Sequence, residues 1–150
     1  MAFNVKPMNN KELARYWFEE IWNKKNPAVI HQLLHEECVG HTEGGKVVGP
    51  AAFERESFDV LSTAFPDIQV TIDGIIGEGD DVVVRWTAVG TNANSLLGIP
   101  ATGGKITFAG MTWLQFSNGK IVEGWDRWNI SGLVNLLQSG QGTATVKSAE

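Results

Sequence analysis

The chain has little cysteine and no long apolar segment. Cys38 is the single cysteine among 150 residues, so no disulfide can form within the chain. No uninterrupted apolar run approaches the ~20 residues that span a bilayer, and the first residues lack the apolar core of a signal peptide. We therefore expect a cytoplasmic protein in a reducing environment, with no membrane partner.

Positive charge is also scarce. Twelve Lys and Arg residues against seventeen Asp and Glu residues give a formal net charge of -5. Phosphate backbones and anionic lipids repel a chain of this charge, so the sequence predicts no nucleic-acid partner. The length and the 43% hydrophobic content are typical of one globular domain, which we assign to residues 1–150.

The first half of the chain has helical periodicity. Over residues 11–23, apolar residues recur in adjacent pairs every four residues, which predicts an amphipathic helix. Pro27 suits a first helical position and begins a second helix, which we expect to end near Cys38. A glycine-rich turn follows, and residues 49–66 predict a third helix between two prolines.

From residue 68 onward the hydrophobic period changes to two, which predicts strands. Residues 82–90 form the second of them, after a turn at residues 77–81. Asn118-Gly119 is a preferred pair for a two-residue hairpin turn and joins residues 105–116 with residues 121–129. Helices followed by antiparallel strands are the order of an α+β fold, in which helices cover one face of a curved sheet.

The end of the chain has two parts. Residues 130–137 are apolar and predict a short helix or a strand extension. Residues 139–150 lack apolar periodicity, and we expect them to be a loose tail outside a core of about residues 8–138.

The expected register of the last hairpin selects a candidate residue for proton transfer. If residues 118–119 are the two turn residues, Met111 lies opposite Asp126. One face of the hairpin then has Asp126 as its only ionisable group, among Met111, Trp113 and Trp128. An apolar concavity disfavours the charged carboxylate and raises its pKa toward the range useful for catalysis. The alternative is a structural carboxylate that is solvated or pairs with a neighbouring arginine.

Three histidines and the cysteine lie close together in the sequence. His31, His35, Cys38 and His41 could each ligate zinc, but their spacing matches no known zinc framework, so we expect no metal. His41 follows the second predicted helix, where a loop could place it over a pocket mouth; the alternative is a solvated histidine. The glycine pairs are turn glycines, and no nucleotide signature is present.

Several segments together form a recognisable pattern: residues 21–26 (IWNKKN), 64–67 (AFPD), 78–86 (EGDDVVVRW), 98–103 (GIPATG) and 118–126 (NGKIVEGWD). They resemble the SnoaL-like polyketide cyclases, also called predicted ester cyclases, over about residues 8–138. The most specific pieces are the Gly-Ile-Pro segment and the Gly-Lys-Ile-Val-Glu hairpin. The resemblance implies the nuclear transport factor two-like, ketosteroid-isomerase-like α+β cone, in which a curved antiparallel sheet wraps around N-terminal helices and encloses a pocket.

The resemblance also implies an activity. Such an enzyme closes a ring in a polyketide-like ester or ketone by a cofactor-free intramolecular aldol reaction, with an aspartate on the last strand as general acid/base. Asp126 matches that aspartate. His41 matches a histidine that the family often has after its second helix, which implies that His41 lines the pocket as a second catalytic residue, where it or Asn129 could donate a hydrogen bond to the enolate oxygen. Asn129 stands where many relatives have a second acidic residue, and it can orient a carbonyl group but cannot take a proton. We expect the substrate to contact Trp113, Trp128, Met111, Asn129, Trp17 and Phe18.

Other functions fit the same fold. An isomerase, a dehydratase and an epoxide hydrolase are alternatives, as is a binding module that holds a hydrophobic metabolite without chemistry. In each case the expected partner is a small hydrophobic molecule. The resemblance further implies a homodimer or homotetramer.

Overall fold

The computed structural model describes residues 7–140 and 142–144. Its first helix, α1 (Asn10–Phe18), continues as a π-helical segment, η1 (Glu19–Asn23), which confirms the helix predicted over residues 11–23. A capping box begins it: the Asn9 side chain accepts a hydrogen bond from the backbone N–H of Glu12 at 2.8 Å, and Glu12 accepts one from the N–H of Asn9 at 3.3 Å.

The third predicted helix is also confirmed. It consists of α3 (Pro50–Phe53), the π-helical segment η2 (Glu54–Phe58) and α4 (Asp59–Ala64), which follow one another without a break. Pro50 occupies a first helical position, where its missing N–H costs nothing, and the helix ends before Pro66.

The second helix is shorter than predicted. α2 (Ala28–Leu33) ends where the backbone of Leu34 becomes extended, and residues up to Thr42 form the strand β1 (Leu34–Thr42). β1 pairs in parallel with a strand more than 80 residues later in the chain and antiparallel with β2 (Gly45–Val48). This long-range pairing overrides local helical periodicity, so the prediction of a helix to Cys38 was wrong.

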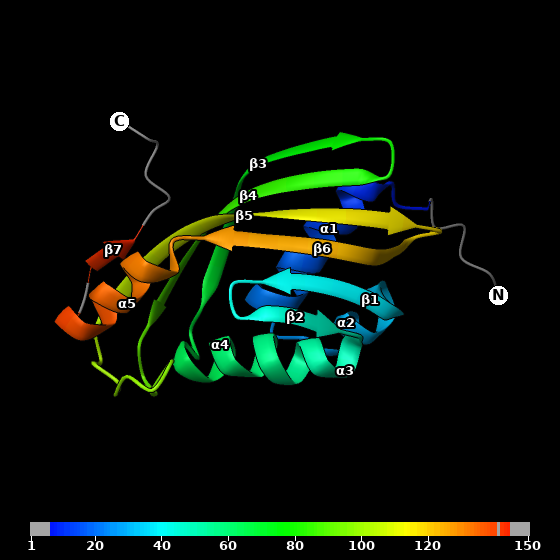
Figure 1. Ribbon diagram of the computed structural model, residues 1–150. Helices are drawn as coiled ribbons and strands as arrows, with labels where there is room; N and C mark the ends of the chain where they lie inside the picture. Colours follow the sequence, from blue (N-terminus) through cyan, green and yellow to red (C-terminus); the bar gives the residue numbers. More distant parts are fainter. Residues whose placement is uncertain (1–6, 141, 145–150) are drawn as a thin grey trace.

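The remaining strands are β3 (Gln69–Glu78), β4 (Asp81–Thr91), β5 (Lys105–Ser117) and β6 (Lys120–Trp128). The sheet has the order β2-β1-β6-β5-β4-β3, and neighbouring strands in this order are antiparallel except for β1 and β6. The sheet is curved, and the helices α1 to α4 lie on one side of it (Figure 1). The predicted α+β class is confirmed.

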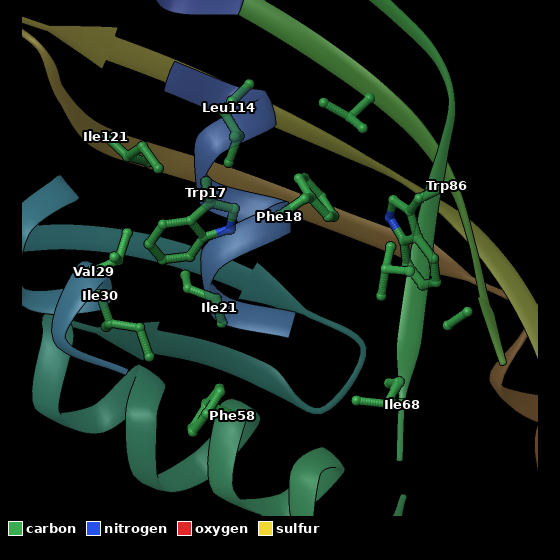
Figure 2. Close-up of a cluster of buried hydrophobic side chains, with 14 of the residues drawn as sticks. Trp17, Phe18, Ile21, Val29, Ile30, Phe58, Ile68, Trp86, Leu114 and Ile121 are labelled. Carbon is green, nitrogen blue, oxygen red and sulfur yellow. The ribbon is translucent and has the colours of Figure 1, made fainter. Parts of the chain in front are cut away.

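The core fills the space between these helices and the sheet. Figure 2 shows that side chains from the helices, among them Trp17, Ile21 and Phe58, point toward Trp86 and Leu114 on the sheet. These side chains are all buried, and burial of this apolar surface is the main force that holds the two layers together. The sheet face turned toward the helices is called the inner face below.

A β-bulge displaces the predicted register of the last hairpin. Asn118 and Gly119 form the expected turn, both with positive φ (51° and 76°), and Phe116 pairs with Ile121 as predicted. The next pair is Gln115 with Glu123, so one residue of β6 has no partner. Beyond this bulge every side chain of β6 lies opposite a different residue from the one predicted. The observed pairs include Leu114 with Gly124, Trp113 with Trp125, Thr112 with Asp126 and Met111 with Arg127.

The chain then continues into α5 (Ile130–Ser139) and a short strand, β7 (Gly142–Ala144). β7 pairs in parallel with residues 106–108 of β5, beyond the point where β6 ends. The prediction of a loose tail was therefore wrong for residues 142–144, while residues 141 and 145–150 lie outside the described residues. No helix in the described ranges is long and apolar enough to cross a membrane.

Candidate active site

A cavity of about 230 Å³ lies between the helices and the inner face of the sheet. Its walls are largely apolar, and aromatic side chains from several elements meet there: Trp17 and Phe18 of α1, Trp86 of β4, Phe108 of β5 and Trp128 of β6. The structure thus places Trp17, Phe18 and Trp128 on the cavity wall, as expected. A concave apolar site with few polar groups is the usual form of a binding site for a small molecule.

Asp126 also lines this cavity, from a position two residues before the end of β6. Because the bulge sets the face of every later residue in β6, Asp126 shares the inner face with Gly124 and Trp128. Its partner across the hairpin is Thr112, which is 5% exposed, and not Met111 as predicted. Asp126 therefore reaches the cavity as expected, but with different neighbours.

A directed chain of hydrogen bonds holds one oxygen of Asp126. The indole Nε1–H of Trp86 donates to Oγ1 of Thr112 at 3.0 Å, and the Thr112 hydroxyl donates to Oδ1 of Asp126 at 2.6 Å. An indole N–H can only donate, so it occupies the acceptor side of the hydroxyl and directs the Thr112 proton toward Asp126. Within the part of the chain that the structure describes, Oδ2 of Asp126 accepts no hydrogen bond.

Burial raises the pKa of Asp126, because the apolar cavity disfavours the charged carboxylate. The hydrogen bond from Thr112 and the positive charge of Arg127 oppose this effect, and the negative charge of Glu43 adds to it. Thr112 and Arg127 offset only a part of the desolvation, so the net direction is upward. A carboxylate whose pKa is raised is a stronger base than a solvated one and still returns the proton as an acid.

Glu43 is a second carboxyl group at this cavity, and sequence reasoning missed it. It lies in the turn between β1 and β2 and lines the cavity. Its Oε1 accepts a hydrogen bond of 3.1 Å from the backbone N–H of Trp128. No local motif marks Glu43, because the parallel pairing of β1 with β6 brings it beside a strand 80 residues away. Among the described residues that line the cavity there is no Lys, Arg or His.

Met111 and Trp113 lie on the opposite face of the sheet, called the outer face below. Met111 is 46% exposed and Trp113 is 49% exposed, and neither lines the cavity. The Trp113 indole donates to Oδ1 of Asp81 at 2.9 Å, on the same outer face. The prediction that both residues share a face with Asp126 was wrong, because the bulge between Gln115 and Phe116 shifts the register by one residue.

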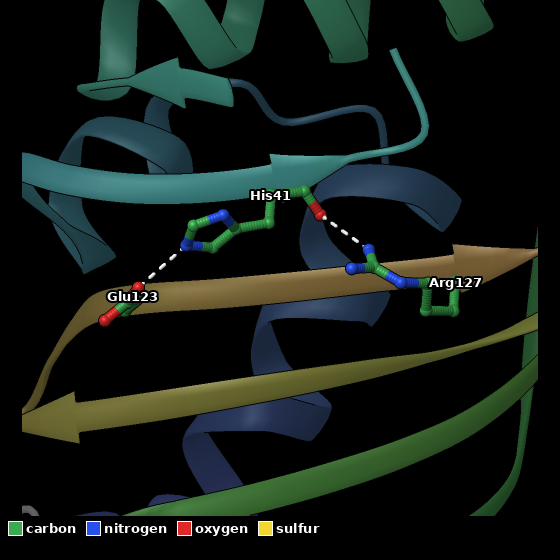
Figure 3. Close-up of polar contacts among 3 residues, drawn as sticks. All are labelled: His41, Glu123 and Arg127. Atoms are coloured by element: carbon green, nitrogen blue, oxygen red, sulfur yellow. Dashed lines mark hydrogen bonds and ion pairs between the residues drawn. The ribbon is translucent and has the colours of Figure 1, made fainter. Parts of the chain in front are cut away.

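His41 also lies on the outer face. Its Nε2 is 2.7 Å from Oε2 of Glu123, and its ring stacks on Trp125 with a centroid distance of 5.4 Å. Figure 3 shows the imidazole turned toward Glu123 and the backbone oxygen of His41 turned toward Arg127, which donates to it at 3.4 Å. The neighbours Gly40 and Thr42 line the cavity, so strand alternation turns His41 away from it. The expectation that His41 lines the pocket was wrong.

Asn129 lies at the junction of β6 and α5. Its side-chain Oδ1 accepts a hydrogen bond of 2.9 Å from the backbone N–H of Gly132, so it caps α5. The following residue, Ile130, lines the cavity, whereas Asn129 does not. The expected contact of Asn129 with a substrate therefore has no support in this geometry.

The family model of SnoaL-like polyketide cyclases matches residues 12–137. A search of curated proteins gave no significant match.

Solved structures with the same fold are numerous. A protein from Jannaschia sp. CCS1 that is proposed to be a SnoaL-like polyketide cyclase has a TM-score of 0.81 and 20% sequence identity. The match covers 92% of this chain and 99% of that protein's chain. AclR from Streptomyces galilaeus, proposed to be a hydroxylase, has a TM-score of 0.76 and 25% identity, covering 87% of this chain and 96% of its own. IdmH from Streptomyces antibioticus, proposed to be a polyketide cyclase, has a TM-score of 0.74 and 20% identity, covering 85% and 97%.

Proposed function

The chain belongs to the SnoaL-like polyketide cyclase family, and from this premise we propose that it closes a ring in a polyketide-like ester or ketone by an intramolecular aldol reaction. The reaction needs no cofactor, because moving one proton and forming one carbon–carbon bond changes no oxidation state overall. Asp126 is the general acid/base. The substrate is a small and largely apolar molecule held in the cavity beside Asp126.

The single observation that supports this proposal most is the asymmetric environment of Asp126. Thr112 holds Oδ1 by a hydrogen bond of 2.6 Å, while Oδ2 accepts none from the described residues, and the group lines an apolar cavity. A structural carboxylate would pair both oxygens with donors or cations. One fixed oxygen and one oxygen without a donor are the arrangement that a proton carrier needs.

The proposed reaction proceeds in three steps. Oδ2 of Asp126 removes a proton from the carbon that lies between two carbonyl groups of the substrate, which leaves an enolate. The enolate carbon attacks a ketone carbon of the same molecule, so a carbon–carbon bond forms and the electron pair of that C=O moves to its oxygen. The resulting alkoxide takes the proton back from Asp126, which regenerates the carboxylate.

The composition of the cavity limits the substrates that can react. The described lining residues include no cation that could stabilise an isolated enolate. The substrate must then spread the negative charge itself, as a 1,3-dicarbonyl unit does. The flat walls formed by Trp17, Trp86 and Trp128 suit conjugated or cyclic parts of such a molecule.

The test uses synthetic β-keto esters that have a ketone within reach of the acidic carbon, with the cyclised product measured by mass spectrometry. Asp126→Asn keeps the size and polarity of the side chain but cannot shuttle the proton, so the rate should fall by roughly 10²- to 10⁴-fold. Asp59→Asn, on the exposed start of α4, is the matched control and should keep the wild-type rate. Binding without turnover in the wild-type protein would favour a binding module over an enzyme.

A further inference from the structure

Asp126 and Glu43 are the two acidic groups at the β6 end of the cavity. Asp126 projects from β6, and Glu43 reaches β6 from the β1–β2 turn through its hydrogen bond with the Trp128 amide. β1 pairs with β6 only as far as His41 and Trp125, so beyond this point the Trp128 amide has no backbone partner on β1. The carboxylate of Glu43 takes that place, which fixes it two residues beyond Asp126 along β6.

We propose that Glu43 is a positioning residue for the general acid/base, and that its negative charge at the β6 end of the cavity makes the Asp126 carboxylate a stronger base. The role of Glu43 in catalysis rests on the proposed function, whereas its electrostatic effect on Asp126 does not. The hydrogen bond from the Trp128 amide holds the Glu43 side chain beside β6. Two nearby carboxyl groups without a cation between them resist double ionisation.

The other groups around Asp126 leave this assignment in place. Arg127 follows Asp126 directly on β6 but is exposed, and its guanidinium donates to the backbone oxygens of His41 and Asp126. Thr112 on β5 donates to Asp126 and carries no charge. Cys38 of β1 and Glu56 of η2 also line the cavity; burial raises the pKa of the Cys38 thiol to about 11, so the thiol is neutral near pH 7.

The test is a titration of the Asp126 carboxyl carbon by NMR, assigned by its loss in Asp126→Asn. Glu43→Gln keeps an oxygen that can accept from the Trp128 amide but removes the charge. It should lower the titration midpoint of Asp126 by ~0.5 pH unit or more. Glu37→Gln, exposed on β1 and outside the cavity, removes the same charge and should leave the midpoint in place. Glu43→Asp, which keeps the charge, should stay closer to the wild-type midpoint than Glu43→Gln does.

The titration needs no substrate, so it separates this inference from the proposed function. An unchanged midpoint in Glu43→Gln would overturn the inference, whatever the protein catalyses. A lowered midpoint in a protein that turns over no enolisable substrate would support the effect of Glu43 on Asp126 and refute the cyclase. If the protein is active, the acidic limb of the pH–rate profile of Glu43→Gln should move to lower pH together with the titration midpoint of Asp126.

Discussion

The hydroxyl of Thr112 donates to Oδ1 of Asp126 at 2.6 Å, and the same hydroxyl accepts from the indole of Trp86 at 3.0 Å. Both bonds are located on the inner face, where Thr112 is almost completely buried. The donor-only indole fixes the direction of these two hydrogen bonds, so Oδ1 of Asp126 accepts from the Thr112 hydroxyl. This chain orients the carboxyl group while its other oxygen remains available to a molecule in the cavity.

Thr112→Val should remove this orientation at nearly constant volume. The Asp126 carboxylate loses the hydrogen bond from Thr112, so the pKa of Asp126 should rise further. The acidic limb of the pH–rate profile should then move to higher pH. The Trp86 indole loses its acceptor in a buried site, which should cost about 1 to 3 kcal/mol of unfolding free energy. Thr112→Ser keeps the hydroxyl and should retain both properties; an unchanged pH profile in the valine variant would contradict the role of this bond.

Trp128 and Trp113 lie on opposite faces of the sheet and form a matched pair for ligand binding. A flat aromatic ketone should quench tryptophan fluorescence on binding in the cavity. Trp128→Ala should weaken this binding by about tenfold, because the ring lines the cavity. Trp113→Ala should leave the dissociation constant nearly unchanged, because its ring lies on the outer face. The reverse order of effects would place the binding site on the outer face.

Asp126 and Asp67 should affect stability with opposite dependence on pH. Burial raises the folded-state pKa of Asp126, so its contribution is fully present below the unfolded value of about 3.8 and is lost as the pH rises through the folded pKa. The Asp126→Asn variant should therefore become more stable relative to the wild type as the pH rises from 3 to 7. Urea denaturation across this range measures the difference.

Asp67 is the control for this measurement. Its pKa is lowered, first by the hydrogen bond from the Thr91 backbone N–H at 2.7 Å and also by the Thr91 hydroxyl. Its contribution is present above the unfolded pKa and is lost as the pH falls through the folded pKa. Asp67→Asn should thus be less stable than the wild type at pH 7 and should approach it in acid. Parallel curves for the two variants would refute the assigned causes.

The acidic lining should discriminate between esters and free acids. A β-keto ester should bind on the order of tenfold more tightly than the corresponding carboxylate at pH 7, because Glu43 and Asp126 repel an anion and no described lining residue attracts it. Glu43→Gln should narrow this ratio, mainly by improving the affinity for the acid. Isothermal titration of both ligands provides the comparison. Equal affinities in the wild-type protein would show that neither carboxyl group lies near the ligand.

Local patterns in the sequence predict much of the fold. The helix at α1, the helix between Pro50 and Pro66, and the turn at Asn118-Gly119 follow from periodicity, proline positions and turn preferences, which act over a few residues. Residues 34–38 of β1 were predicted as helix, because their extended conformation depends on pairing with β6, more than 80 residues away. No local signal in residues 34–42 indicates this partner.

Only a part of the site was predicted, because the rest depends on the register between distant segments of the chain. Counting back from the turn placed Asp126 beside Met111 and Trp113, whereas the bulge places it opposite Thr112. A bulge adds one residue to one strand, and nothing in Val122 or its neighbours marks it in the sequence. Asp126 reaches the cavity because the bulge at Val122 places both Ile121 and Gly124 on the inner face, and the alternation then continues through Asp126 and Trp128. Glu43 was missed because the same unpredicted pairing of β1 brings it to β6.

The most direct measurement of the central claim is the exchange of the acidic proton of a β-keto ester with deuterium, followed by NMR in D₂O. Exchange requires only proton removal and return, so it does not depend on knowing the natural substrate. The wild-type protein should accelerate exchange above the buffer rate, and Asp126→Asn should lose about 10²- to 10⁴-fold of that acceleration while still binding the ester. If Asp126→Asn exchanges the proton as fast as the wild-type protein, Asp126 is not the proton carrier.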